Sequence, residues 1–116
     1  MANVVITISL KPGTTSLYLT DSNGKQGEPE GFKTYAGRGD LIIWQLAPDS
    51  GIDALTGIQA KDGNFDIFRN SDPKCNSNVS WSGKIKDDAA GADKYNINYQ
   101  IGTDAYSEDP EIIIKP

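Results

Sequence analysis

The chain has 116 residues, with sixteen acidic and eleven basic side chains, a formal net charge of −5 and no histidine. Its length fits one domain spanning residues 1–116, and its scattered lysines and arginines exclude a nucleic-acid partner or an anionic membrane, since both need clustered cations. Without histidine, Ser-His-Asp catalysis, Cys-His catalysis and ordinary zinc sites are excluded, so we expect no enzyme.

The first part of the sequence predicts four strands separated by turn-forming residues. In residues 3–10, apolar side chains alternate with polar ones, which indicates one buried face. A short strand at 16–20 follows, and the glycine- and proline-rich segment 21–31 predicts a long polar loop. The next strand lies at 32–36. The nearly continuous apolar run at 40–46 is typical of a central strand that is covered on both faces.

The middle of the sequence leaves two interpretations open. Ile52, Leu55 and Ile58 have helical spacing, but neighbouring glycines lower helix propensity, so we expect a turn or a single helical turn there. Residues 58–61 and 64–69 flank an Asp-Gly dipeptide at the spacing of a β-hairpin.

The last part of the sequence alternates turn chemistry with strands. Residues 70–78 are rich in Asn, Ser and Asp and predict a loop. A strand with a kink or bulge at Gly83 is expected at 79–86. The clearest alternation of the whole chain is at 94–101, and a final strand is expected at 111–115.

Nine short strands, frequent turn signals and no helix of normal length indicate an all-β protein. This pattern favours a two-sheet Greek-key β-sandwich of cupredoxin-like or immunoglobulin-like topology over a barrel or propeller.

Two stretches of the sequence resemble the cupredoxin-like β-sandwich family. They are FKTYAGRGDLIIWQL (residues 32–46) and KYNINYQIGTDAYSEDPEIIIKP (residues 94–116). In that family a Gly-Asp step precedes a strand containing Trp, and two paired strands close the chain. The alternating Tyr strand followed by Asp109, Pro110 and a β-branched strand is also similar to the endings of uncharacterised bacterial cupredoxin-like and inclusion-body-type proteins.

Copper chemistry is not expected despite this resemblance. Copper proteins of this fold bind the metal through two His side chains and one Cys thiolate. This chain has no histidine, its single cysteine, Cys75, comes well before the closing strands where the family places its thiolate, and Met1 is its single methionine. We therefore expect no copper, no zinc and no other cofactor, except for the calcium considered next.

Calcium is the cation that suits the remaining ligands, because it binds carboxylate and carbonyl oxygens presented by loops. The candidate ligands are Asp104, Glu108 and Asp109. Two further acidic stretches qualify, Asp21 with Asn23, and Asp87 with Asp88 and Asp93. The alternative is that these carboxylates are simply hydrated, as is common in an acidic protein.

The two tryptophans have different expected roles. Trp44 lies in the apolar run and is predicted to be in the core. Trp81 is flanked by serines, so it either packs in the core of the second sheet or is exposed. An exposed aromatic platform is a common way to bind sugar rings. Trp81 and Tyr106, the latter in a predicted polar loop at 102–110, are therefore the candidate residues for binding a glycan.

A third hypothesis needs no ligand site. Asn96, Asn98 and Gln100 form a polar face, and an unprotected terminal strand can pair with another copy, although Lys115 and Pro116 can blunt that edge. The functional prediction is a non-catalytic structural, self-assembling or protein-interaction module, with a homo-oligomer as one form. The alternative is a carbohydrate-binding domain assisted by calcium.

The N-terminal segment lacks the charged region of a signal peptide, so the sequence predicts a cytoplasmic protein, or a secreted one if a leader was removed.

Overall fold

The computed structural model describes residues 3–61 and 63–115, and every regular element in these ranges is a β-strand. The strands are β1 (Asn3–Leu10), β2 (Leu17–Asp21), β3 (Gln26–Gly27), β4 (Lys33–Ala36), β5 (Leu41–Leu46), β6 (Ala54–Ala60), β7 (Lys74–Ser77), β8 (Ser80–Lys84), β9 (Ala92–Ile101), β10 (Asp104–Glu108) and β11 (Glu111–Ile114). The predicted all-β class is confirmed. Within the described residues, no helical segment has the length and apolarity needed to cross a bilayer.

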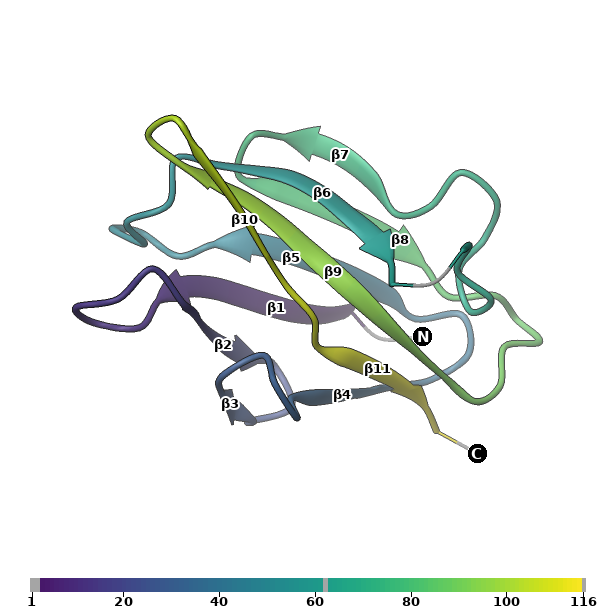
Figure 1. The fold of residues 1–116 in the computed structure, drawn as a ribbon. Coiled ribbons are helices and arrows are strands. Elements are labelled where there is room, and N and C mark those ends of the chain that lie inside the picture. The colour runs from purple at the N-terminus through teal and green to yellow at the C-terminus, as the bar shows by residue number, and fades with distance from the viewer. Residues whose placement is uncertain (1–2, 62, 116) are drawn as a thin grey trace.

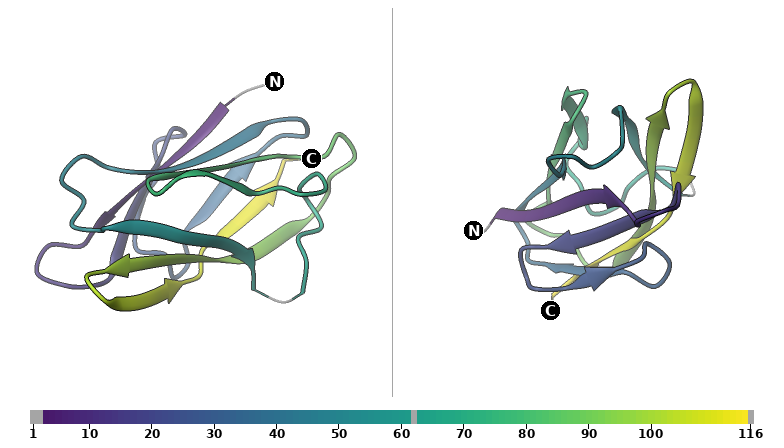
Figure 2. Two further views of the ribbon diagram at one scale, coloured as in Figure 1. Left: turned by 90° about the horizontal axis from the view of Figure 1, so that it is seen from above. Right: turned by 90° about the vertical axis from the view of Figure 1, so that its left-hand side faces the viewer.

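The strands form two sheets that face each other (Figure 1; Figure 2). The first sheet has the order β3-β2-β1-β5-β8-β7, with β1 parallel to β5. In the second sheet β6 pairs with one edge of β9, while β10 and then β11 pair with the other edge, and β4 lies parallel to β11. The predicted two-sheet β-sandwich is confirmed. The finer resemblance to cupredoxin-like proteins stays a prediction.

The core lies between the sheets, where the alternating side chains of each strand meet. Trp44 in β5 is fully buried, as predicted, and its indole Nε1–H donates a hydrogen bond to the Tyr95 hydroxyl of β9 at 3.0 Å. The two ring centroids are 5.6 Å apart in an edge-on arrangement. This contact joins the middle of the first sheet to the middle of the second and satisfies both buried polar groups.

The predicted hairpin of residues 58–61 and 64–69 is wrong. Residues 54–60 instead form β6 and pair with β9, and the following segment makes a single bridge between Phe68 and Ile85. Ile67 and Phe68 are adjacent and both buried. In a strand with one exposed face, one of two adjacent side chains would point to solvent, so this segment is not such a strand. The N–H of Ile67 donates to the Asp93 carboxylate instead of to a neighbouring strand.

Residues 54–58 are extended, so the expected turn or helical turn is absent from this stretch. The helical spacing of Leu55 and Ile58 has another cause. The pairing of β6 with β9 shifts register between Leu55 and Gly57, which marks a bulge. The inserted residue moves the next buried side chain by one position, and the apolar pattern then imitates a helix.

Two predicted loops contain strands. Residues 74–77, within the expected loop 70–78, form β7, and residues 104–108, within the expected loop 102–110, form β10. Most residues of both strands are exposed, so their polar sequences carry none of the alternation that marks a half-buried strand. The segment expected to be a loop at 21–31 likewise contains β3, a two-residue strand.

Gly83 is not the site of a bulge, because β5 and β8 pair in regular register through it. The glycine is required for another reason. A Cβ atom there would lie 2.9 Å from the Phe68 ring and 3.2 Å from the Cα atom of Pro73. The absence of a side chain therefore lets the segment before β7 pack directly on β8.

Candidate functional site

Trp81 is half-buried and packs against the core. It lies in β8 directly opposite Trp44 of β5, and its indole Nε1–H donates to the carbonyl oxygen of Leu55 in β6 at 3.3 Å. The side chain packs against the core, as in the first interpretation, but its predicted place in the second sheet is wrong, because Trp81 lies in the same sheet as Trp44. The indole ties β8 of the first sheet to β6 in the second.

Tyr106 lies in β10 and stacks on Tyr99 of β9, with ring centroids 5.4 Å apart. It is half-buried and comes from the second sheet, whereas Trp81 comes from the first. No ring contact within the described residues joins Trp81 to Tyr106. Glycan binding through these two residues stays a prediction.

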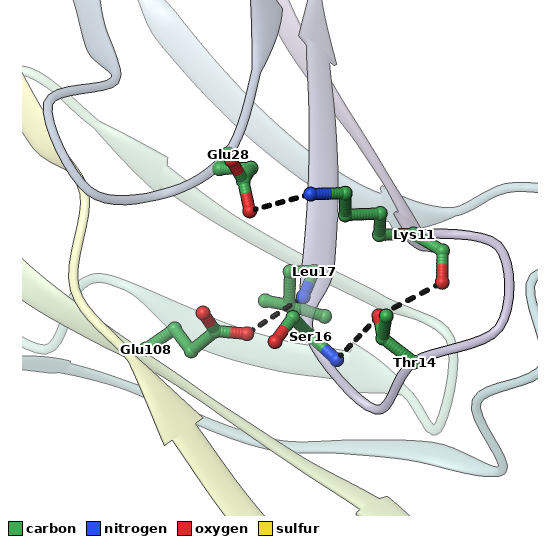
Figure 3. Close-up of polar contacts among 6 residues, drawn as sticks. All are labelled: Lys11, Thr14, Ser16, Leu17, Glu28 and Glu108. Carbon is green, nitrogen blue, oxygen red and sulfur yellow. Dashed lines mark hydrogen bonds and ion pairs between the residues drawn. The ribbon is translucent and has the colours of Figure 1, made fainter.

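The Glu108 carboxylate joins the two sheets, as Figure 3 shows for its contact with Leu17. Its Oε2 atom accepts a hydrogen bond from the Leu17 N–H at 2.6 Å and lies 2.9 Å from the Tyr99 hydroxyl. That hydroxyl also lies 2.6 Å from the Thr15 carbonyl oxygen. Since hydrogen bonds to a charged acceptor are stronger than neutral ones, Glu108 is a structural link between β10 and β2.

The three carboxylates predicted to bind calcium do not converge on one point. Asp104 and Glu108 lie at opposite ends of β10, about 13 Å apart along the strand. Asp109 forms an ion pair with Lys61 at 2.5 Å, and this lysine lowers the pKa of the Asp109 carboxyl. In residues 3–61 and 63–115, no group of three or more His, Cys, Asp or Glu side chains is placed to hold a metal ion. Calcium binding stays a prediction.

The two buried tyrosines of β9 make stability sensitive to alkaline pH. Burial raises the pKa of the Tyr95 hydroxyl, and burial followed by the hydrogen bond to Glu108 raises the pKa of the Tyr99 hydroxyl. In the unfolded chain both ionise near pH 10, as tyrosine normally does. Their contribution to stability is therefore complete below about pH 10 and is lost as the pH rises toward the folded-state values.

We therefore expect urea denaturation to give a clearly lower free energy of unfolding at about pH 11 than at about pH 9. Tyr99→Phe removes one of the two groups, so the difference between the two pH values becomes smaller in this variant. An unchanged difference in Tyr99→Phe would show that the Tyr99 hydroxyl does not contribute.

A shallow groove of about 680 Å³ lies beside the loop between β1 and β2. Leu10, Pro12 and Tyr18 line it, together with Lys11 and Glu28, which form an ion pair at 3.3 Å (Figure 3). Both partners of this pair are exposed, so it adds little to stability. The groove is mainly apolar, and its two charged lining residues, Lys11 and Glu28, are paired with each other.

The outer edge of β4 is covered by side chains of the turn between β2 and β3. Asn23 Nδ2 donates to the Tyr35 carbonyl oxygen at 2.9 Å, and Lys25 Nζ donates to the Lys33 carbonyl oxygen at 2.9 Å. The Lys25 ammonium also lies 4.8 Å from the centre of the Tyr35 ring. These contacts occupy the acceptors that an added strand would use, which is a common way to protect a sheet edge.

Two further edges are protected in other ways. The start of β6 is covered by the β7–β8 hairpin, because the Leu55 N–H donates to the Asn78 carbonyl oxygen at 2.7 Å. The outer edge of β10 carries Asp104 and Glu108. Antiparallel pairing of β10 with a second copy, centred on Tyr106, would place Asp104 opposite Glu108, and directly opposed like charges are destabilising.

All four residues of β7 are exposed, whereas each of the other strands in the described part of the chain has at least one residue that is not. It ends the first sheet and pairs with β8 alone (Figure 1). Val79, in the turn that follows it, is 49% exposed. Cys75 is exposed as well. β7 therefore combines an open backbone edge with apolar surface at the tip of its hairpin.

A family model described as a domain of unknown function (DUF8788) matches residues 1–106. The chain belongs to this family. The DUF8788 match runs from β1 into β10 and includes β7, whereas β11 lies beyond it although it pairs with β9 and β4 in the structure.

No curated protein matches this DUF8788 chain. Among solved structures it is similar to that of a cysteine protease inhibitor, EhICP2, from Entamoeba histolytica. The two sequences are 16% identical, the alignment covers 99% of this chain and 97% of that chain, and the TM-score is 0.47.

The sequence analysis missed the exposed edge strand β7. It placed Cys75 in a loop, because Asn and Ser around it favour turns. One sequence signal could have predicted this strand. Serine and lysine residues lie on both sides of the Asn78–Val79 turn, and they are typical of a hairpin whose two faces contact water.

Proposed function

We propose that this protein is a non-catalytic interaction module that associates with a second copy of itself through β7. The observation that supports the proposal most directly is the contrast between edges. β4, β10 and the start of β6 are each protected, while β7 is exposed throughout and pairs on one side only. An open edge of this kind is a template for adding another strand.

The sequence of β7 is compatible with antiparallel pairing to itself. In a two-fold arrangement centred on Cys75, this residue faces its own copy, Lys74 lies opposite Asn76 of the second copy, and no like charges face each other. The exposed Val79 extends the contact beyond the strand. Because four residues form a small interface, we expect a weak and reversible dimer.

This proposal predicts that Cys75→Glu abolishes self-association. Each dimer then carries two new carboxylates near its two-fold axis, where opposed like charges are destabilising. Sedimentation velocity under reducing conditions should show the average mass of the wild-type protein rising with concentration, while Cys75→Glu stays monomeric.

The matched control is Ala90→Glu, which adds the same charge at an exposed residue outside β7. This variant should associate like the wild type. A wild-type protein that stays monomeric at all concentrations, or a Cys75→Glu variant that associates normally, would contradict the proposal.

A further inference from the structure

We propose that a second surface, the groove beside the end of β6, binds an extended acidic peptide segment of another protein. The groove has a volume of about 530 Å³. One wall is the strand end Ile58–Ala60, and the other is formed by residues of the segment 64–73. This surface is separate from the β7 edge, so it does not depend on self-association.

The backbone of β6 offers hydrogen-bonding groups to this groove. The Lys61 N–H donates to the Lys94 carbonyl oxygen of β9, so position 61 faces β9. Because backbone groups alternate along an antiparallel strand, those of Gln59 also face β9, and those of Ile58 and Ala60 point the other way, into the groove. Beyond the Leu55 contact, no strand among the described residues pairs with this edge of β6. An extended peptide can add here as a further strand.

The opposite wall is fixed in place before any ligand arrives. The Arg69 N–H donates to the Lys84 carbonyl oxygen, and the Lys84 N–H donates to the Asp72 carboxylate at 2.8 Å. Phe65 and Phe68 pack edge to face beneath this wall, with ring centroids 4.9 Å apart. A preformed groove binds with less loss of conformational entropy than a mobile loop does.

The charge of the groove identifies its ligand class. Arg69 and Lys86 line it, and neither side chain forms an ion pair within the described part of the chain. Asp72, which also lines the groove, uses its carboxylate to accept the Lys84 N–H. Two available cations on a protein of net charge −5 favour a negatively charged partner strand.

Fluorescence anisotropy with labelled peptides tests this inference. The probe is a fluorescein-labelled peptide of about eight alternating Glu and Val residues, which is extended and acidic. We expect saturable binding to the wild-type protein. The double variant Arg69→Gln/Lys86→Gln should bind at least about tenfold more weakly, which corresponds to the loss of one close charge pair.

Two controls separate strand addition from simple charge attraction. Ala60→Pro removes an N–H that faces the groove and leaves the β6–β9 pairing intact, so it should weaken binding while the circular dichroism spectrum is unchanged. A Glu-Val peptide with N-methyl groups on alternate residues should also lose affinity, because it cannot form the ladder. The Cys75→Glu variant should bind the probe normally, which separates this test from that of self-association.

Three results would overturn the inference. They are an absence of binding to the wild-type protein, equal affinity for an alternating Lys-Val peptide, and unchanged affinity in both the charge variant and Ala60→Pro.

Discussion

Replacing Trp44 with alanine is expected to lower the free energy of unfolding by about 3–5 kcal/mol. The indole is fully buried, packs against the rings of Tyr95 and Phe68, and donates a hydrogen bond to the Tyr95 hydroxyl. Alanine leaves a cavity between the sheets and removes the partner of a buried hydroxyl, and both effects are destabilising. Since small domains are stable by only about 5–15 kcal/mol, this variant should lie close to unfolding.

Urea denaturation of two variants provides the measurement and its control. Trp81→Ala removes the same side chain from a half-buried position, where part of the indole already contacts water, so its cost should be clearly smaller. If Trp44→Ala changed stability by less than about 1 kcal/mol, or cost less than Trp81→Ala, the assignment of Trp44 to the centre of the core would be wrong.

The second large effect is expected at Gly83. An alanine Cβ atom there would lie 2.9 Å from the Phe68 ring and 3.2 Å from the Cα atom of Pro73, and neither group can move without disturbing the wall of the β6 groove. Overpacking of this kind costs about 1–3 kcal/mol. We expect Gly83→Ala to lower the urea midpoint, and Gly83→Val to lower it further.

Gly57→Ala is the matched control for Gly83→Ala. Its Cβ atom would meet the Asn98 side-chain amide at 2.9 Å, but this amide is the end of a side chain that can rotate away. Gly57→Ala should therefore cost much less than Gly83→Ala. Equal costs at the two positions would show that the close contact with Phe68 and Pro73 is not what requires glycine at 83.

The sequence predicts most reliably the strands that have one buried face. The alternation at residues 3–10 and 94–101 corresponds to β1 and β9, because each lies in the middle of a sheet and contacts the core on one side. The apolar run at 40–46 corresponds to β5, which lies between β1 and β8, but the prediction that both its faces are covered is wrong, because Leu41 and Ile43 are only half-buried. At these positions burial determines the residue pattern, so the pattern reports burial.

The sequence does not predict the structure where something other than the burial of one strand face determines the residue types. Ile67 and Phe68 are adjacent and both buried because a side-chain carboxylate, Asp93, replaces a neighbouring strand as the hydrogen-bond acceptor. β7 and β10 are mostly exposed and therefore have no apolar alternation. The candidate sites depend on which edges the topology leaves open, and pairing between distant strands is not encoded in any local pattern.

The measurement that tests self-association through β7 most directly uses the single cysteine of the chain. A spin label attached to Cys75 marks the centre of β7 without any other substitution. At high protein concentration, double electron–electron resonance should give a short distance between two labels, within about 20 Å, because paired strands lie about 5 Å apart. Wild-type protein that self-associates without any such short distance would show that copies meet through another surface.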